Sequence, residues 1–167
     1  MRILAFDQAS VITGWALFED GELAESGEFN LKKVKDIEER HRQMDLCLVS
    51  LMESKQPDLV VIEDIFLSGR VMNVQTVMRI AFSRGLIVGW CHVHNIAIER
   101  SLPTAWRRIL NFRQGKNVGR KELKQQALDY LKEHFNMETT HEDQADAICI
   151  GHATVLKYER SLCHEGS

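Results

Sequence analysis

The sequence predicts an α/β domain in which a mixed five-stranded β-sheet is flanked by helices. Three observations lead to this class. The first 30 residues contain short runs of alternating apolar and polar residues, which is the pattern of half-buried strands. The run Asp-Leu-Val-Val-Ile-Glu at 58–63 is almost continuously apolar, as expected for a strand covered on both faces. Elsewhere apolar residues recur every three or four positions, which indicates amphipathic helices.

The predicted elements can be placed in order along the chain. Asp20-Gly21 is a typical hairpin turn, so the strands on either side of it are expected to be antiparallel. Pro57 follows the end of one helix, and Pro103 opens another. Strands are expected at 2–7, 11–18, 22–30, 58–63 and 95–100, and helices at 34–56, 72–92, from 103 onward, 119–135 and 141–159.

The predicted helix at 72–92 is apolar nearly all round, and its large side chains include Val77, Ile80, Phe82 and Trp90. A helix of this kind must bury more than one side. A second copy of the chain would cover the additional side, so we expect a homodimer.

The length and composition fit one globular domain spanning residues 1–167. The chain is 44% hydrophobic and 27% charged, and a core of this size needs no disulfide or structural metal. The apolar stretch at 1–6 is too short for a signal peptide, so we expect a cytoplasmic protein without a membrane segment. The cysteines lack C-x-x-C spacing and are expected to be free thiols: Cys47, Cys91, Cys149 and Cys163.

The charge is unevenly distributed along the chain. The net charge is -3, but residues 100–124 carry eight basic side chains against the single acid Glu122. Such a basic segment is the electrostatic footprint of a protein that binds nucleic-acid phosphates. The alternative is an ordinary solvated surface.

Four acidic residues stand at positions where their side chains can meet. Asp7 and Glu63 each close an apolar strand, and a lone carboxylate there would be costly to bury. Asp143 and Asp146 lie three residues apart near a helix start, on one face and close to the positive end of the helix dipole. Each residue taken singly could instead cap a turn or a helix. Together the acids predict a metal-binding cluster.

The chemistry of such a cluster is two-metal phosphodiester hydrolysis. Four carboxylates would repel one another, and two Mg²⁺ ions would offset their charge with the hard oxygen ligands that Mg²⁺ prefers. One ion would activate a water for in-line attack, and the other would stabilise the leaving oxygen. We therefore expect a nuclease with Asp7, Glu63, Asp143 and Asp146 as catalytic and metal-binding residues.

Three motifs of the sequence resemble those of the RuvC family of Holliday junction resolvases. The segment A-F-D-Q-A-S-V-I-T-G-W-A-L at 5–17 resembles the first motif, with an Asp at a strand end and a Thr-Gly pair after it. V-I-E-D-I-F at 61–66 is similar to the family's I-E-x-x-F motif. H-E-D-Q-A-D-A-I-C-I at 141–150 resembles the C-terminal block that supplies the last two ligands. The order and approximate spacing agree over the whole chain.

The resemblance implies an RNase H-like fold and a homodimer that nicks Holliday junctions and other branched DNA symmetrically, leaving 5′-phosphate and 3′-hydroxyl ends. It implies two Mg²⁺ ions per site, with Mn²⁺ able to substitute. Gln8-Ala9 stands where the family usually has Pro-Gly, which resembles phage-encoded relatives. Arg120 aligns approximately with the family's active-site lysine.

The resemblance and the basic segment together predict the DNA contacts. Phe66 takes the place of an aromatic residue that stacks on unpaired bases in the family, although a core position after a strand is the alternative for it. The remaining contacts are expected from basic side chains that meet phosphates. The predicted set is Phe66, Arg70, Arg107, Arg108, Lys116, Arg120 and Lys121.

Three rival functions can be compared with this prediction. A ribonuclease H acting on RNA–DNA hybrids shares the fold and metals, but its third acid usually comes earlier than the C-terminal D-x-x-D here. A non-catalytic junction-binding recombination protein would have lost at least one acid, and all four are present. An actin-like ATPase needs two such domains and paired Gly-rich loops, which the length and the glycines exclude.

Overall fold

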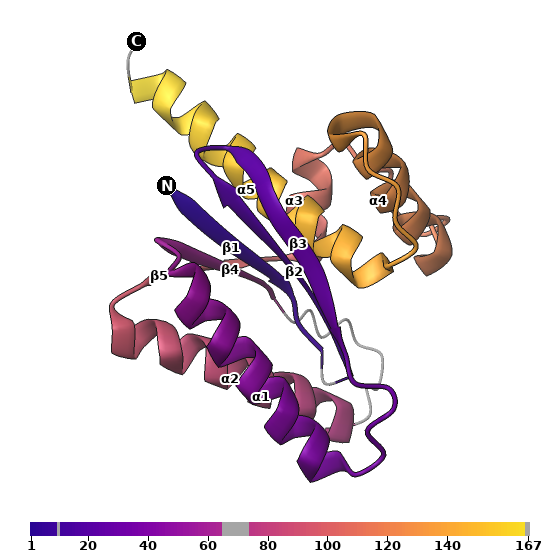
Figure 1. Ribbon diagram of the computed structural model, residues 1–167. Coiled ribbons are helices and arrows are strands. Elements are labelled where there is room, and N and C mark those ends of the chain that lie inside the picture. Colours follow the sequence, from indigo (N-terminus) through magenta and orange to yellow (C-terminus); the bar gives the residue numbers. More distant parts are fainter. Residues whose placement is uncertain (10, 65–73, 166–167) are drawn as a thin grey trace.

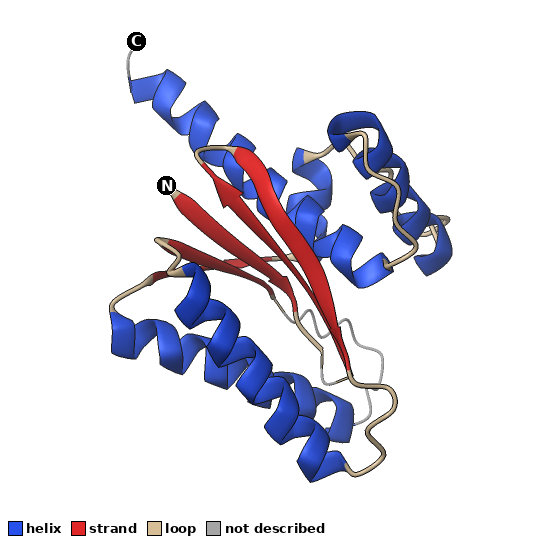
Figure 2. Ribbon diagram, viewed as in Figure 1, coloured by secondary structure: helices blue, strands red, loops and turns tan. Residues whose placement is uncertain are grey.

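In the computed structural model, which describes residues 1–9, 11–64 and 74–165, five strands form one mixed sheet in the order β3-β2-β1-β4-β5. β1 pairs antiparallel with β2, and β2 pairs antiparallel with β3, whereas β1, β4 and β5 run parallel (Figure 2). The α/β class and the five-stranded mixed sheet predicted from the sequence are confirmed. The strands are β1 Arg2–Asp7, β2 Ile12–Glu19, β3 Glu22–Asn30, β4 Leu59–Glu63 and β5 Ala97–Ser101.

Helices cover both faces of the sheet (Figure 1). Two helices lie on one face and the other three lie on the opposite face, so each face has its own apolar core. None of the helices in the described part of the chain is long and apolar enough to cross a lipid bilayer. The first face carries α1 Ile37–Lys55 and α2 Val74–His94, and the second carries α3 Pro103–Ile109, α4 Arg120–Phe135 and α5 Glu142–Glu165.

The alternation of side chains along the central strands decides which way the acids point. In β1, Ile3 and Ala5 belong to the core under α3, α4 and α5, whereas Leu4 and Phe6 belong to the core under α1 and α2. Successive strand residues face opposite sides of a sheet. Asp7 therefore continues the side of Ile3 and Ala5, toward the helices that carry the other acids.

Two glycines allow α5 to lie unusually close to the sheet. A Cβ atom on Gly14, in β2, would overlap the main-chain carbonyl of Asp143. A Cβ atom on Gly151, within α5, would stand 2.5 Å from a ring carbon of Phe18. Any larger residue would push the helix away from the strands, so these positions fix where α5 begins relative to the end of β1.

The observed boundaries differ from the predicted ones at helix and strand ends. α1 starts at Ile37 rather than at 34, because the Asp36 side chain caps the helix by accepting from the Glu39 N–H at 2.8 Å. β5 starts at Ala97 rather than at 95, because Asn95 adopts a positive φ of 55° in the turn after α2. Local turn chemistry of this kind overrides a hydrophobic pattern.

The cysteines in the described part of the chain agree with their prediction. Cys47, Cys91 and Cys149 are free thiols, and the last two are buried. The Cys163 side chain lies outside the described side chains, as do residues 65–73, in which Phe66 and Arg70 fall.

The close contact at Gly151 predicts a stability defect. Replacing Gly151 with alanine would force the fully buried Phe18 ring to move, so we expect the free energy of unfolding to fall by about 1–3 kcal/mol. Gly89→Ala on α2 is the matched control, because an added Cβ atom there would have nothing within 4 Å, and alanine should stabilise the helix by up to about 1 kcal/mol. Urea denaturation measures both. Equal stabilities of the two variants would contradict the tight packing of α5.

Candidate active site

Asp7 and Glu63 lie next to each other at the carboxyl ends of two parallel strands. β1 and β4 pair with Phe6 opposite Ile62, so the residues that follow them emerge side by side. Glu63 lies two residues after Val61 in β4, so both side chains are on the same face of the sheet, and Val61 faces the core under α3, α4 and α5. Both carboxylates therefore point to the same side of the sheet, as their strand-end positions predicted.

Hydrogen bonds tie the strand ends together at this site. The side-chain amide of Gln8 donates to the main-chain oxygen of Glu63 at 2.7 Å. The Asp64 N–H donates to the main-chain oxygen of Ser101 at 2.8 Å, which joins the end of β4 to the end of β5. The relative positions of β1, β4 and β5 are thus fixed next to the two carboxylates.

Lys124 on α4 brings the acids of α5 together with Asp7. Its ammonium nitrogen lies 2.6 Å from Oδ2 of Asp146 and 3.0 Å from Oδ1 of Asp143. It is also 3.9 Å from Oδ2 of Asp7. All four predicted acids line one pocket of about 390 Å³, together with Gln8, Arg107, Arg120 and Lys124.

Lys124 is the residue that the sequence prediction missed. Arg120 aligns approximately with the family's active-site lysine, but the structure places Lys124, one helical turn later, among the acids. Arg120 is exposed and lines the same pocket. The signal was present in the sequence, because Lys124 shares the i, i+3, i+7 stripe of Ala127 and Leu131, both buried.

Burial and mutual repulsion shift the pKa values of the acids. Burial raises the pKa of Asp7 well above its usual range, and the carboxylates of Asp146 and Glu63 raise it further. Burial also raises the pKa of Asp146, and the nearby Lys124 ammonium opposes this effect. The same carboxylates outweigh the burial of Lys124 and raise its pKa, so the lysine stays charged. One cation thus compensates several acids only in part.

The residues of the pocket suit hard divalent cations in donor type and in charge. Carboxylate oxygens are the ligands that Mg²⁺ and Mn²⁺ prefer. In the described residues, no three His, Cys, Asp or Glu side chains are already arranged around a common metal position. The Lys124 ammonium bonds two of the carboxylates instead. Each of these bonds uses one carboxylate oxygen, so the other oxygens of the four acids remain available as ligands.

Two of the predicted DNA contacts, Arg107 and Arg120, line this pocket. Nη2 of Arg107 is 4.0 Å from Oε1 of Glu63, at the inner wall. Arg108, Lys116 and Lys121 are exposed. The structure therefore separates Arg107, which faces an acid, from the basic residues that face solvent.

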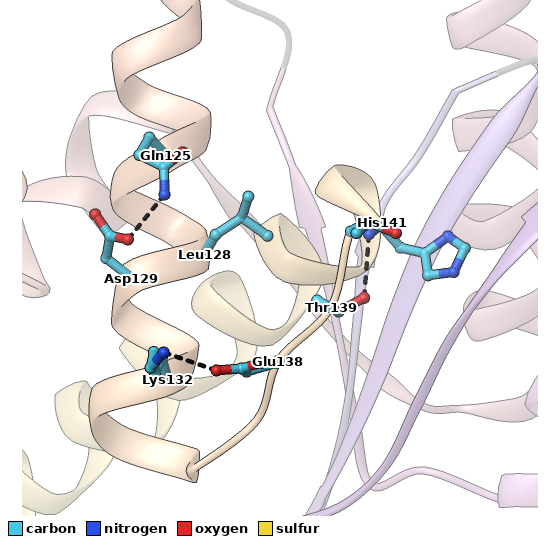
Figure 3. A pocket seen from close by; sticks show the side chains of 8 residues that line it. Gln125, Leu128, Asp129, Lys132, Glu138, Thr139 and His141 are labelled. Atoms are coloured by element: carbon cyan, nitrogen blue, oxygen red, sulfur yellow. Dashed lines mark hydrogen bonds and ion pairs between the residues drawn. The ribbon is translucent and has the colours of Figure 1, made fainter.

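A larger groove lies away from the acids, between α4 and the segment that leads into α5 (Figure 3). Its volume is about 570 Å³. Its polar side chains are bonded to one another: Gln125 donates to Asp129 at 2.8 Å, and Lys132 pairs with Glu138 at 2.7 Å (Figure 3). The acid pocket, although smaller, holds the unbalanced charge and is the better candidate for a reactive site.

The fold and the site together define a class: an RNase H-like fold with four carboxylates in one pocket, two at the ends of neighbouring parallel strands and two on a helix. No family model matches the chain. Over 172 residues it is 27% identical to the crossover junction endodeoxyribonuclease RuvC of Geotalea uraniireducens, covering 100% of this chain and 90% of that protein. RuvC of Caldicellulosiruptor saccharolyticus is 24% identical, covering 99% of this chain and 98% of its own length.

Solved structures agree with these sequence relatives. The T. thermophilus RuvC in complex with a Holliday junction substrate has a TM-score of 0.75 at 11% identity, covering 96% of each chain. The Fowlpox virus resolvase with Holliday junction DNA has a TM-score of 0.61 at 16% identity, covering 97% of this chain and 99% of that one. The homologues of this chain are thus RuvC proteins, and the resemblance and the RNase H-like fold predicted from the sequence are confirmed.

The raised pKa of Asp7 predicts a pH dependence of stability. The folded protein binds a proton at Asp7 more tightly than the unfolded chain does, so stability falls as the pH rises from about 4, the usual carboxyl pKa, toward the raised value. We expect Asp7→Asn to weaken this fall and to stabilise the metal-free protein at neutral pH, while the raised pKa values of Glu63 and Asp146 preserve the rest of the pH dependence.

Urea denaturation in EDTA at several pH values measures this effect. Asp129→Asn is the matched control, because Asp129 lies on α4 outside the acid pocket, where it accepts from Gln125. The control should keep the pH dependence of the wild type. A wild-type protein as stable at neutral as at mildly acidic pH would contradict the prediction.

Proposed function

We propose that this protein is a structure-selective endonuclease that cleaves Holliday junctions and other branched DNA with the help of divalent metal ions. The observation that carries the proposal is the meeting of Asp7, Glu63, Asp143 and Asp146, from three distant segments, in one pocket. The relatives named above as crossover junction endodeoxyribonucleases, and the resolvase structures with junction DNA, support the substrate.

The four acids would hold two Mg²⁺ ions, with Mn²⁺ able to replace them. When bound, the ions would supply Lewis-acid activation of water and stabilise charge on the leaving oxygen. The chain's own part is to orient the carboxylates. Lys124, which lies among the acids, would supply a positive charge next to the scissile phosphate. Cleavage would leave 5′-phosphate and 3′-hydroxyl ends.

A homodimer would place two such sites on the two strands of a junction. Within α2, Val74, Met78 and Phe82 are spaced four residues apart and form one exposed apolar face, with exposures of 71%, 54% and 64%. A contiguous apolar face of this kind marks an interaction surface. A second copy of α2 is the occupant that gives two active sites and symmetric nicks.

The DNA would lie across the basic residues that surround the pocket. Arg108, Lys116, Arg120 and Lys121 are exposed, Arg120 lines the acid pocket, and all four are suited to phosphate contacts. Phe66 and Arg70 remain proposed contacts that fall outside the described residues. Phosphate contacts give affinity without sequence information, which suits recognition of branched shape.

Loss of an acid should stop cleavage and spare binding. We expect Asp7→Asn and Asp146→Asn each to lower Mg²⁺-dependent nicking of a four-way junction by about 100-fold or more, because an interaction worth several kcal/mol is removed. Junction binding measured in Ca²⁺ or EDTA should change little. Asp129→Asn should nick as the wild type does, and nicking by either site variant at the wild-type rate would refute the assignment.

The same gel assay separates the alternatives when it offers four-way, three-way, flap and RNA–DNA hybrid substrates with Mg²⁺ or Mn²⁺. Nicking of branched DNA supports the proposal. Cleavage of the hybrid alone identifies a ribonuclease H. Binding of the four-way junction without cleavage under any metal identifies a non-catalytic junction-binding protein.

The exposed basic residues should control the salt dependence of binding. Each lost phosphate contact lowers the slope of log K against log salt by about 0.9. We expect the double variant Arg120→Ala, Lys121→Ala to reduce the magnitude of this slope by nearly twice that amount in a titration with junction DNA. The double variant Lys157→Ala, Arg160→Ala removes the same charge from the distal half of α5 and should leave the slope unchanged. Equal slopes in both double variants would remove Arg120 and Lys121 from the DNA interface.

A charge on the apolar face of α2 should disrupt the dimer. We expect Phe82→Glu to convert a dimeric wild type into monomers in sedimentation equilibrium, because the interface would have to bury an unpaired carboxylate. Leu46→Glu on α1 is the control, since Leu46 is 57% exposed but lies on another helix. A monomeric wild type, or a dimer that survives Phe82→Glu, would contradict this interface.

A further inference from the structure

Trp106 is buried next to the acid site and contacts Glu63 directly. Its side chain is only 1% exposed and packs edge-on against Phe112, with ring centroids 5.7 Å apart. The indole N–H donates to Oε1 of Glu63 at 2.9 Å. A buried indole N–H needs an acceptor, and here the acceptor is one of the four proposed metal-binding carboxylates.

The backbone fixes Trp106 relative to Glu63. Glu63 pairs with Ser101 in the register of β4 and β5, and α3 begins only two residues later, at Pro103. Trp106 therefore lies in the first turn of α3, shortly after Ser101, which pairs with Glu63 and accepts from the Asp64 N–H. The indole and the carboxylate are held at a set distance by paired strands rather than by a flexible loop.

Arg107 reinforces the contact. Its guanidinium carbon lies 4.6 Å from the centre of the Trp106 ring, a distance typical of a cation–π interaction. The same guanidinium is 4.0 Å from Oε1 of Glu63. The indole and the guanidinium therefore meet the same oxygen of Glu63.

We propose that Trp106 is a positioning residue for the proposed nuclease, whose indole N–H fixes the Glu63 carboxylate in the orientation needed for metal binding. The inference rests on the proposed function. An indole is a neutral donor, so it orients the carboxylate without cancelling its charge. An ionised carboxylate has about four lone-pair sites, so one bond to Trp106 leaves acceptors for a metal. Lys124 acts differently, because its positive charge compensates part of the negative charge of its partners.

Metal affinity is the first test of this role. Trp106→Phe keeps a ring in the core and removes only the donor. We expect Mn²⁺ to bind the full-length variant about tenfold more weakly in calorimetry without DNA, the size of effect typical of partners that orient metal ligands. The Mg²⁺ concentration for half-maximal nicking should rise by a similar factor. Trp15→Phe is the matched control, because Trp15 packs against Phe29 away from the acids. An unchanged affinity in Trp106→Phe would overturn the proposal.

A double-mutant cycle separates positioning from packing. If Trp106 acts through Glu63, Trp106→Phe should weaken Mn²⁺ binding in the wild type and have little further effect in the Glu63→Gln background. An equal loss in both backgrounds would show that the ring acts through the core alone and would refute the proposal.

A spectroscopic test needs no Trp106 variant and so does not depend on how well one folds. The indole N–H signal of Trp106 in ¹⁵N-labelled protein can be assigned from the signals that Trp15→Phe and Trp90→Phe remove. We expect added Mg²⁺ to shift the Trp106 signal in the wild type and not in Glu63→Gln. A Trp106 signal that stays fixed while Mg²⁺ binds would overturn the positioning role.

The outcomes distinguish this inference from the proposed function. A protein that nicks branched DNA with no dependence on Trp106 loses only the positioning role. A protein that binds metal through a Trp106-dependent Glu63 but nicks no branched DNA loses only the proposed function.

Discussion

The repulsion among four carboxylates in one pocket is the constraint on which the rest of this structure depends. Two structural units bring the acids together, and a third compensates part of their charge. The parallel pairing of β1 with β4 brings Asp7 and Glu63 together, the close approach of α5 adds Asp143 and Asp146, and α4 supplies the Lys124 ammonium within 2.6 Å of Asp146. Without that cation, several buried charges would lie together in a poorly solvated space, at a cost of several kcal/mol.

The positive charges in the acid pocket do not fully compensate its carboxylates. The three cationic side chains that line the pocket, Arg107, Arg120 and Lys124, do not fully offset its four carboxylates, so the metal-free pocket keeps an affinity for further positive charge. The two apolar cores on either side of the sheet hold the acids in place against their repulsion. Repulsion among the acids lowers the stability of the folded protein, and such a loss of stability at the active site is common in enzymes. Lys124 and Trp106 then play complementary parts, because one compensates charge and the other sets direction.

Much of this arrangement could be predicted from the sequence, and what could not has a physical cause. The alternation of side chains along a strand and the position of its end can be read locally, so the sequence indicated that Asp7 and Glu63 lie at neighbouring strand ends. The i, i+3 spacing sufficed to put Asp143 and Asp146 on one face of their helix. The spacing of Lys124 with Ala127 and Leu131 indicates that it lies on the buried face of its helix, but its contact with the acids depends on the packing of α4 on α5, which no local pattern specifies. Trp106 carries no local signal of its role, because a sequence does not show which acceptor a buried indole finds.

Gly14 has a consequence for how this protein tolerates change. It donates no side-chain bond and carries no charge, yet the absence of its Cβ atom sets the separation between the strand-borne and the helix-borne acids. Because Gly14 has no Cβ atom, β2 and the start of α5 can lie in direct main-chain contact. Moving this acid cluster onto another sheet would therefore require a glycine at the corresponding strand position as well as the four acids.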